Sequence, residues 1–463
     1  MALTKEERQY LGTIYQKLDP LKPLEPDDQF YQPIYGAPGC DDPVDLLQQH
    51  IGWNPIDSMQ MFSGFRGSGK TTELKRLKKN LEEQGYVVLY ADALEYLNPS
   101  QEIEISDLLV VLAGAFSDAI EKEFKVDLGE ESYWSRLKNY LTKTTVSLTE
   151  ARSKTEIDTP LKEWFGGGKA SIDLKFELRD TPSFRQKLQQ FMEGRISELK
   201  NQTHKFIEDG VKIIRKKKGD ETGIVFIFDS LEQLRGSRSN EQSVIRSVER
   251  LFADNMQMLA LPYVHVVYTV PPWLQFAMPG LADIVMLPSV RQWYNDGVRT
   301  SYEPGSNSLC SLIHKRFGEE GCQKYFGTSV DGLYPLAERL IAVCGGHFRD
   351  LLLLFREALL RTKSLPVTED VINLATTSFR STFLPIAIDD AQWLDKIGKL
   401  RTTSLPSVKT EDVTRLTRFL DTHFVLYLTN GEEWYDIHPL IRDEVAAIVQ
   451  RHGELKSSAT PST

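Results

Sequence analysis

The pattern of apolar and polar residues along the first part of the chain predicts an α/β fold. A short strand is predicted at Gln60–Ser63, and a glycine-rich turn follows it. Behind the turn, leucines recur at helical spacing, at Leu74, Leu77 and Leu81, and the apolar run Tyr86–Ala91 then predicts a buried strand. The order strand, turn, helix, strand forms a βαβ unit. It predicts a mostly parallel sheet covered by helices.

Further apolar runs extend this sheet. Ile224–Phe228 and Val264–Val270 predict two more buried strands, with a helix over Glu241–Leu259 between them. Residues 106–124 and 181–216 have helical patterns. The alternation of apolar and polar residues in Ala170–Leu178 predicts a strand or hairpin within an inserted segment.

The two ends of the chain differ from this core. Residues 4–18 have a helical pattern, a Pro- and Gly-rich arm follows, and a short helix is predicted at Pro43–Ile51. Beyond about residue 305 the pattern is helical, until a hairpin is predicted from Phe424–Leu428 and Trp434–Ile437. Helices followed by a hairpin are compatible with a winged helix.

These patterns divide the chain into five predicted parts. They are an N-terminal helix and arm (1–58), an α/β core (59–300) with an insertion at about 127–216, a helical lid (301–378), a winged-helix-like module (379–452) and a disordered tail (453–463).

Composition and charge restrict the class of protein. The 463 residues include 55 Lys and Arg against 65 Asp and Glu, a net charge of −10, which disfavours a protein that mainly wraps nucleic acid. The longest apolar run, Leu108–Phe116, is far shorter than the ~20 residues that span a bilayer. The four cysteines form no CxxC pair, as expected for free thiols in a reducing compartment. We therefore expect a cytoplasmic protein without a membrane partner.

The strongest chemical signal is a glycine-rich octapeptide that satisfies the pattern GxxxxGK[ST]. Its residues are Gly64, Phe65, Arg66, Gly67, Ser68, Gly69, Lys70 and Thr71, and Thr72 follows them. Glycines let the backbone curl so that its N–H groups point at phosphate oxygens. The Lys70 ammonium reaches the β- and γ-phosphates, and the Thr71 hydroxyl is a ligand for Mg²⁺. We predict that residues 64–72 bind a nucleoside triphosphate with Mg²⁺.

Polar residues at the ends of the later strands complete the predicted site. Asp229 follows the apolar strand 224–228, where a carboxylate can help to seat Mg²⁺. Glu232, three residues later, can polarise the water that attacks the γ-phosphate. Thr269 ends the next strand, where a γ-phosphate sensor belongs, because ligands bind at the carboxyl edge of such sheets.

With these motifs in this order, the chain resembles the additional-strand P-loop ATPases, specifically the AAA+ and STAND (NACHT-like) group. The resemblance extends over about residues 25–450. It implies ATP and Mg²⁺ as cofactors. In most AAA+ proteins Glu follows the strand Asp, whereas Ser230 follows Asp229 here, as a small residue does in STAND proteins. This departure implies slow hydrolysis.

The resemblance also implies roles for residues outside the core. Cys344–Leu352 is similar to the GG-x-x-R-D-L segment of Orc/Cdc6-like lids, so Arg349 is expected to act as a second γ-phosphate sensor. The segment around His438 resembles the MHD-type motif of STAND winged helices, whose His contacts the bound diphosphate. By the same analogy, Tyr31 and Tyr35 in the arm are expected to flank the adenine base.

Three functions remain open from the sequence. The first is an Mg²⁺-dependent ATPase that acts as a switch or as a homo-oligomer, with a separate effector protein, in a bacterial conflict or antiviral defence system. The second is a DNA-associated AAA+ loader of the Orc/Cdc6 or transposition type, and the third is a scaffold that holds nucleotide without hydrolysing it. Four arginines are candidates for a finger that reaches a neighbouring subunit: Arg235, Arg238, Arg246 and Arg250.

Overall fold

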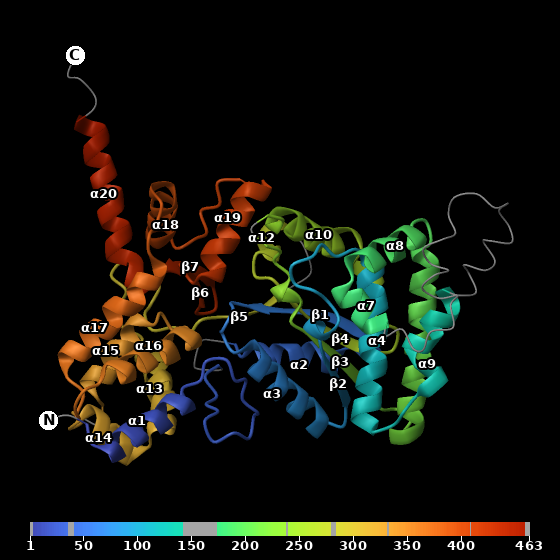
Figure 1. Cartoon of the computed structure of the whole chain (residues 1–463), viewed down its shortest axis with the longest axis horizontal. Helices are drawn as coiled ribbons and strands as arrows, with labels where there is room; N and C mark the ends of the chain where they lie inside the picture. The colour runs from blue at the N-terminus through green and yellow to red at the C-terminus, as the bar shows by residue number, and fades with distance from the viewer. Residues whose placement is uncertain are drawn as a thin grey trace. The chain divides into compact units, whose positions relative to one another are not determined.

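The computed structural model describes residues 3–35, 41–141, 174–237, 239–278, 284–330, 333–407 and 409–458. The chain divides into two compact units (Figure 1). Unit 1 consists of Met1–Leu46, Gly64–Leu77 and Met286–Thr463, and unit 2 consists of Leu47–Ser63 and Lys78–Val285.

A five-stranded sheet is the centre of the α/β part. Its strands are β1 (Ser58–Gly64), β2 (Val87–Asp92), β3 (Ile224–Asp229), β4 (His265–Val270) and β5 (Ile284–Leu287), in the order β2-β3-β4-β1-β5. The pairs β1–β4, β3–β4 and β2–β3 are parallel. The four strands predicted for this sheet are thus confirmed, and β5 is an edge strand that was not predicted. Because β4 lies between β1 and β3, the sheet has the additional strand that the resemblance implied.

The register of the sheet brings the polar strand ends to one edge. Ser63 lies opposite Val270, and Asp92 lies opposite Asp229. Parallel strands that pair in this register end together, so the carboxyl ends of β1, β2, β3 and β4 form a single edge. The residues predicted to bind Mg²⁺ and to sense phosphate, Asp229 and Thr269, lie at this edge.

Helices of unit 2 cover the apolar strands. Helix α4 (Ile105–Phe124) is buried along most of its length, and Phe116 on it packs edge-on against Phe226 of β3, with ring centroids 5.5 Å apart. Gly210 of α9 (Ile196–Lys218) allows close packing, because a Cβ there would lie 2.7 Å from Phe116. Unit 2 also contains α7 (Leu174–Asp180), α8 (Pro182–Met192), α10 (Glu241–Asp254), α11 (Met256–Leu259) and α12 (Leu274–Ala277).

The strand or hairpin predicted at Ala170–Leu178 is wrong where the structure describes it. Leu174–Asp180 is helical, and residues 170–173 lie outside the described residues. Leu174 and Leu178 are both buried, whereas Phe176 between them is 58% exposed. Burial at a spacing of four is helical periodicity, and the apparent alternation arose from the exposed Phe176.

Unit 1 is mainly helical. It includes the whole of α1 (Lys5–Lys17) and the start of α2 (Pro43–Trp53), and α3 (Lys70–Glu83) begins in it. The predicted helical region after 305 consists of α13 (Glu303–Phe317), α14 (Glu319–Phe326), α15 (Pro335–Val343), α16 (Phe348–Arg361) and α17 (Glu369–Arg380).

The last part of the chain has the predicted order of helices and hairpin. Helices α18 (Ile388–Leu400) and α19 (Thr410–Asp421) precede the antiparallel strands β6 (Val425–Thr429) and β7 (Glu433–Ile437), and α20 (Arg442–Ser458) follows them. This is a winged-helix-like module. The disordered tail predicted from residue 453 is wrong up to Ser458, where α20 is helical, and residues 459–463 lie outside the described residues.

An ion cluster holds this module to the segment before α13. Asp436 of β7 is fully buried and pairs with Arg299 at 2.8 Å and Arg442 at 3.1 Å, and also with Arg401. The carboxylate of Asp436 is therefore satisfied internally rather than presented at the surface.

Within the described residues, none of the helices has the length and apolar character needed to cross a membrane.

Candidate functional site

The glycine-rich loop continues directly from β1 into α3. Gly67 and Gly69 have φ angles of +86° and +95°, in the left-handed region that glycine adopts without a steric cost. The Ser68 hydroxyl donates to the Phe65 carbonyl at 2.8 Å, which closes the turn. The sequence therefore places its glycines where the backbone needs them.

Lys70, the first residue of α3, folds back onto this loop. Its ammonium donates to the carbonyl oxygens of Gly64 at 2.9 Å and Phe65 at 3.0 Å, and the residue is 6% exposed. The cation thus lies within the curl of the loop backbone, beside the start of the helix. The contact of Lys70 with phosphates stays a prediction.

The start of α16 packs on the same loop. A Cβ at position 67 would lie 2.7 Å from both Cβ and Nε of Arg349, and one at position 69 would lie 3.7 Å from the ring of Phe348. The structure thus brings Arg349 to the glycine-rich loop. Its role as a γ-phosphate sensor stays a prediction.

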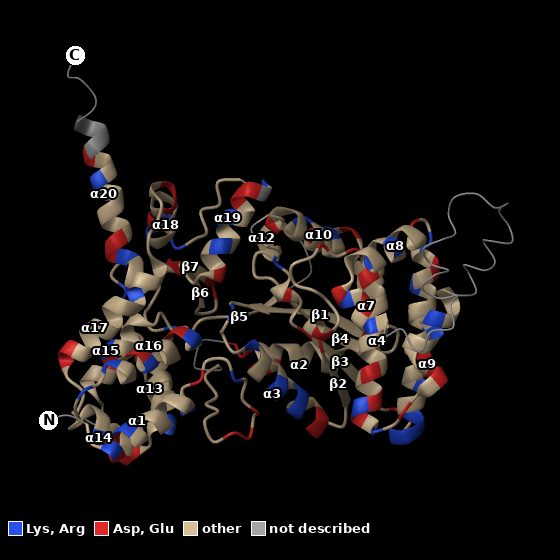
Figure 2. Cartoon of the chain, viewed as in Figure 1, with Lys and Arg blue, Asp and Glu red and all other residues tan. Residues whose placement is uncertain are grey.

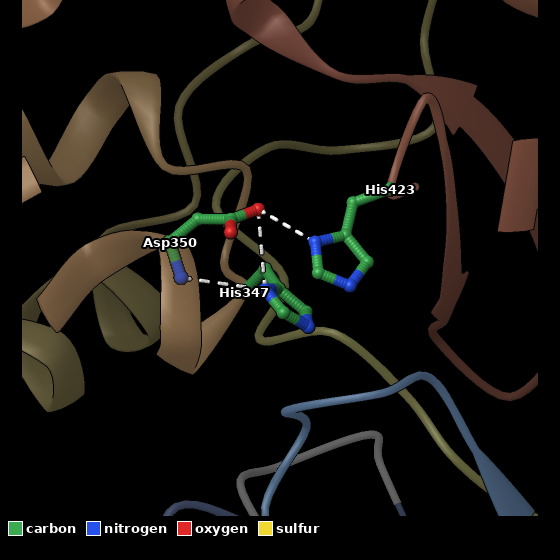
Figure 3. Close-up of side chains that lie close together, drawn as sticks. All are labelled: His347, Asp350 and His423. Carbon is green, nitrogen blue, oxygen red and sulfur yellow. Dashed lines mark hydrogen bonds and ion pairs between the residues drawn. The ribbon is translucent and has the colours of Figure 1, made fainter. Parts of the chain in front are cut away.

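Two histidines and a carboxylate form a buried cluster (Figure 3). His347 Nδ1 lies 3.2 Å and His423 Nδ1 lies 3.0 Å from Asp350 Oδ2. The opposite nitrogen of each ring, Nε2, lies 3.1 Å (His347) and 2.8 Å (His423) from the carbonyl oxygen of Arg66. We call His347, Asp350 and His423 the histidine cluster.

Burial and mutual contacts together set the pKa values of His347, Asp350 and the adjacent His438. Burial lowers the pKa of His347 to about 4 and that of His438 to about 3. Burial alone would raise the pKa of Asp350, but the neighbouring His347 and His423 outweigh it and hold that pKa well below its usual range. Asp350 is therefore an anion at neutral pH, and His347 and His438 are uncharged.

His438 lies against the histidine cluster. It is completely buried, its Nδ1 accepts from the Leu440 N–H at 3.3 Å, and its ring stacks on Phe383 with centroids 4.8 Å apart. Its Nε2 lies 3.6 Å from Asp350 Oδ2. The contact between His438 and a diphosphate stays a prediction.

Sequence reasoning missed the histidine cluster. His347 and Asp350 are three residues apart in the segment singled out for Arg349, a spacing that puts both on one side of a helix start. That spacing is a usable signal. His423 lies 73 residues beyond Asp350, so no local pattern connects them.

The arm is tied to the start of α3. The Tyr31 hydroxyl donates to Glu73 at 3.3 Å, and Arg76 bonds both Glu73, at 2.7 Å, and Asp42, at 2.8 and 2.5 Å. The Tyr35 hydroxyl donates to the Pro288 carbonyl at 3.2 Å. The arm is thus held by specific bonds, and the contact of Tyr31 and Tyr35 with a base stays a prediction.

Thr72, predicted as part of the nucleotide site, contacts the arm, and its part in nucleotide binding stays a prediction. Its Oγ1 accepts from the backbone N–H of Leu24 at 3.1 Å.

In unit 2, the strand ends are linked by hydrogen bonds. Asp229 is 1% exposed and accepts from the Tyr90 hydroxyl at 2.5 Å. Burial and the Asp229 charge raise the pKa of Tyr90, so its hydroxyl stays a donor.

The turn after β3 is fixed from β4. Thr269 Oγ1 accepts from the Leu231 N–H at 3.1 Å, and this bond holds the turn that begins at Ser230, whose φ is +74°. Glu232 lies in this turn, a 3₁₀-helix over Leu231–Gln233.

The candidate finger arginines have different environments. Arg250 pairs with Glu104 at 3.2 Å with its side chain 56% exposed. Arg238 lies outside the described residues. A role of any of these arginines in a neighbouring subunit stays a prediction.

A separate cavity of about 690 Å³ lies in unit 1. It is lined by residues of the arm and of α13, α14 and α15, among them Gln32, His314 and Tyr334. Its lining shares no residue with the loop 64–72 or the histidine cluster, so it does not form part of this site.

Comparison with known proteins gives distant structural likeness. No protein-family model matches the chain, and no curated protein matches it. The Orc2 protein of Aeropyrum pernix in its ADP form is similar, with 12% identity, a TM-score of 0.40, and 92% of this chain and 97% of that chain covered. Its ADPNP–ADP complexes have 10% identity and a TM-score of 0.38, covering 93% and 98%. Cdc6p from Pyrobaculum aerophilum has 9% identity and a TM-score of 0.33, covering 95% and 98%.

At this level of identity and TM-score, we infer function from the residues of this chain alone. The GxxxxGK[ST] loop follows β1, and β4 separates β1 from the strand that carries Asp229. The chain therefore has the fold of a P-loop NTPase core of the additional-strand type, with a helical lid and a winged-helix-like module.

Proposed function

We propose that the chain binds ATP with Mg²⁺ and hydrolyses it slowly. The observation that carries this proposal is the loop Gly64–Thr71, with left-handed Gly67 and Gly69 and with the Lys70 ammonium inside its curl. Backbone N–H groups of such a loop, together with the start of a helix, bind the phosphates of a nucleotide.

The residues predicted to hold Mg²⁺ carry oxygen donors that suit this ion. The loop leaves β1 at the carboxyl edge of the sheet, and Asp229 ends β3 at that edge. A hydroxyl and a carboxylate are oxygen ligands of the kind that Mg²⁺ prefers, so Thr71 and Asp229 would hold it. Mg²⁺ would neutralise charge on the β- and γ-phosphates. Tyr90 orients the Asp229 carboxylate through its 2.5 Å hydrogen bond.

The turn after β3 supports slow turnover. Ser230 occupies the position where most AAA+ proteins have Glu, and the next acid along the chain is Glu232, two residues further on. Glu232 positions the attacking water, and Thr269 and Arg349 respond to the γ-phosphate. A base displaced from the strand end lowers the rate without removing nucleotide binding.

A switch follows from the packing of Arg349 on Gly67. A γ-phosphate at the loop would attract the Arg349 guanidinium, and α16 begins at the preceding residue, Phe348. ATP and ADP would thus differ in their contacts with the lid, which is what shifts a two-state equilibrium. The histidine cluster extends this coupling to His423, just before β6.

Turnover measurements on matched variants test the proposal. We expect slow, Mg²⁺-dependent release of phosphate by the wild type, loss of release in Glu232→Gln, and wild-type release in Glu221→Gln, a change in the exposed turn before β3. Equal, negligible release by all three proteins together with retained ATP binding would instead indicate a scaffold that does not hydrolyse nucleotide.

The biological setting we propose, an ATPase of a bacterial defence system with a separate effector protein, rests on the family resemblance. A DNA loader is disfavoured by the net charge of −10. Helices α19 and α20 of the C-terminal module carry both acidic and basic residues (Figure 2). Stimulation of ATP turnover by DNA that falls steeply with added salt would favour the loader instead.

A further inference from the structure

We propose that His347, His423 and Asp350 bind a divalent transition-metal ion with the ligand preferences of Zn²⁺. This ion is distinct from the Mg²⁺ of the nucleotide. It would connect the start of α16, the segment before β6 and, through Arg66, the phosphate-binding loop, all of which belong to unit 1.

The ligand atoms converge as a metal site requires. His347 Nδ1 and His423 Nδ1 lie 3.2 and 3.0 Å from Asp350 Oδ2, and each of the three residues offers one ligand atom within 4.8 Å of those of the other two. Ligands about 2.0–2.1 Å from a tetrahedral Zn²⁺ are roughly 3.3–3.4 Å apart. Two imidazoles and one carboxylate, all buried, are a common ligand set for this ion.

In metal-binding histidines, the ring nitrogen that does not bind the metal usually donates a hydrogen bond to an oxygen atom, and both imidazoles here have such a partner. Both Nε2 atoms face the carbonyl oxygen of Arg66, at 3.1 Å for His347 and 2.8 Å for His423. An N–H donated from Nε2 to a carbonyl fixes the tautomer in which Nδ1 carries the lone pair. Without a metal ion, that lone pair of His347 accepts from the Asp350 backbone N–H at 3.4 Å, and a bound ion would replace this long contact.

The N–H groups of two neutral imidazoles are too few for the oxygen atoms that the rings of His347 and His423 face. Each ring faces two oxygen acceptors, Arg66 O and Asp350 Oδ2, but a neutral imidazole carries only one N–H. Protonating both rings would bring two cations together, because their centroids are 3.7 Å apart. A metal ion on the Nδ1 side removes this conflict, since both rings stay neutral and both Nε2 protons point at Arg66.

His438 gives an independent indication of a ligand. Its Nε2 is buried, has no hydrogen-bond partner among the described residues, and lies 3.6 Å from Asp350 Oδ2. Because its Nδ1 accepts from the Leu440 N–H, Nε2 carries the proton and faces the cluster as a donor. A water in the fourth position of the ion would accept that proton.

The backbone at His423 supports a functional constraint. Its φ is +60°, in the left-handed region, which is strained for a residue other than glycine. Such conformations persist where surrounding structure requires them, often at ligand sites. This conformation orients the His423 ring toward Asp350 and Arg66.

Metal analysis of the full-length protein tests the proposal. The protein is stripped with a chelator, dialysed, incubated with Zn²⁺ in the absence of nucleotide and Mg²⁺, dialysed again and analysed by mass spectrometry for metal. We expect about one Zn²⁺ per chain in the wild type. We expect at least a tenfold loss of affinity in His423→Asn and Asp350→Asn, and no loss in the control His265→Gln, which changes a buried histidine of β4.

A ligand-retaining variant separates metal binding from loss of folding. His423→Cys provides a thiolate ligand, so it should bind Co²⁺ and gain a sulfur-to-cobalt charge-transfer band that the wild type lacks. Zn²⁺ uptake by His423→Asn equal to that of the wild type would overturn the proposal, as would absence of Zn²⁺ and Co²⁺ binding by the folded wild type. Neither outcome would affect the proposed binding of ATP.

Discussion

At the scale of single residues, Gly67 has two independent reasons to be glycine. Its φ is +86°, and an added Cβ would lie 2.7 Å from Arg349. We predict that Gly67→Ala lowers ATP affinity at least about tenfold, because it displaces both the loop and the arginine on it. Calorimetric titration with ATP and Mg²⁺ measures this change.

Gly85→Ala is the matched control for this substitution. Gly85 has a similar φ, +90°, but its Cβ would meet no atom within 4 Å. It should therefore carry the same backbone strain without a change in ATP affinity. Equal affinities of the Gly67 and Gly85 variants would contradict the role assigned to the contact with Arg349.

Tyr90 provides a second test at this scale. Tyr90→Phe removes the hydroxyl that donates to Asp229 Oδ2. A hydrogen bond to a charged group contributes about 1.5–3 kcal/mol. We therefore expect the factor by which Mg²⁺ increases ATP affinity to be roughly tenfold smaller in Tyr90→Phe than in the wild type. Binding in the presence of a chelator should be unchanged.

The measurement compares ATP titrations with and without Mg²⁺. Tyr86→Phe, just before the opposite end of β2, is the control. If Tyr90→Phe responds to Mg²⁺ as the wild type does, Asp229 does not depend on Tyr90 for its orientation.

The sequence allowed prediction of one part of the site and not of the other. The loop 64–71 is predictable because its chemistry depends on consecutive residues. The histidine cluster depends on His423, whose approach to Asp350 follows from the packing of the C-terminal module on the lid within unit 1. Such an approach is a tertiary property with no local pattern.

At the scale of elements, the start of α3 is fixed by a buried ion cluster. Arg76 pairs with Asp42 and Glu73, whose side chains are each 7% exposed. We predict that Arg76→Ala lowers the free energy of unfolding by about 3–5 kcal/mol, because it leaves buried carboxylates without their partner. Urea denaturation followed by circular dichroism measures it.

Lys399→Ala on α18 is the control for this prediction. Lys399 pairs with Asp395 at 2.7 Å, but its side chain is 70% exposed, so the loss should be about 0.5 kcal/mol or less. Similar losses from the two substitutions would show that the arm is not held through Arg76.

The elements themselves were predictable where periodicity was long. The apolar strand Ile224–Phe228 and the amphipathic helix Glu241–Asp254 were recognised because several residues repeat the same pattern. Strand β5 has four residues, and α7 has seven with an exposed Phe176. Elements this short contain too few repeats to distinguish a period of two from one of 3.6.

At the scale of the whole molecule, the proposed switch predicts nucleotide-dependent assembly. With ADP, we expect the mass of one chain, 52.8 kDa, and with a non-hydrolysable ATP analogue a multiple of it. The physical reason is that an arginine from a neighbouring subunit would be attracted to the γ-phosphate. Light scattering coupled to size-exclusion chromatography measures the mass, and a constant monomer would remove the arginine finger from the account.

The most direct test of the account is binding of ATP and Mg²⁺ to the wild type, compared with Lys70→Ala and with Lys75→Ala. Lys75 lies on the same helix and pairs with Glu25 at 2.5 Å, away from the loop backbone that Lys70 contacts. We predict saturable binding by the wild type and Lys75→Ala, and a loss of roughly 10- to 150-fold in Lys70→Ala. Absence of binding by the folded wild type, or equal affinity in all three proteins, would contradict a nucleotide site at residues 64–71.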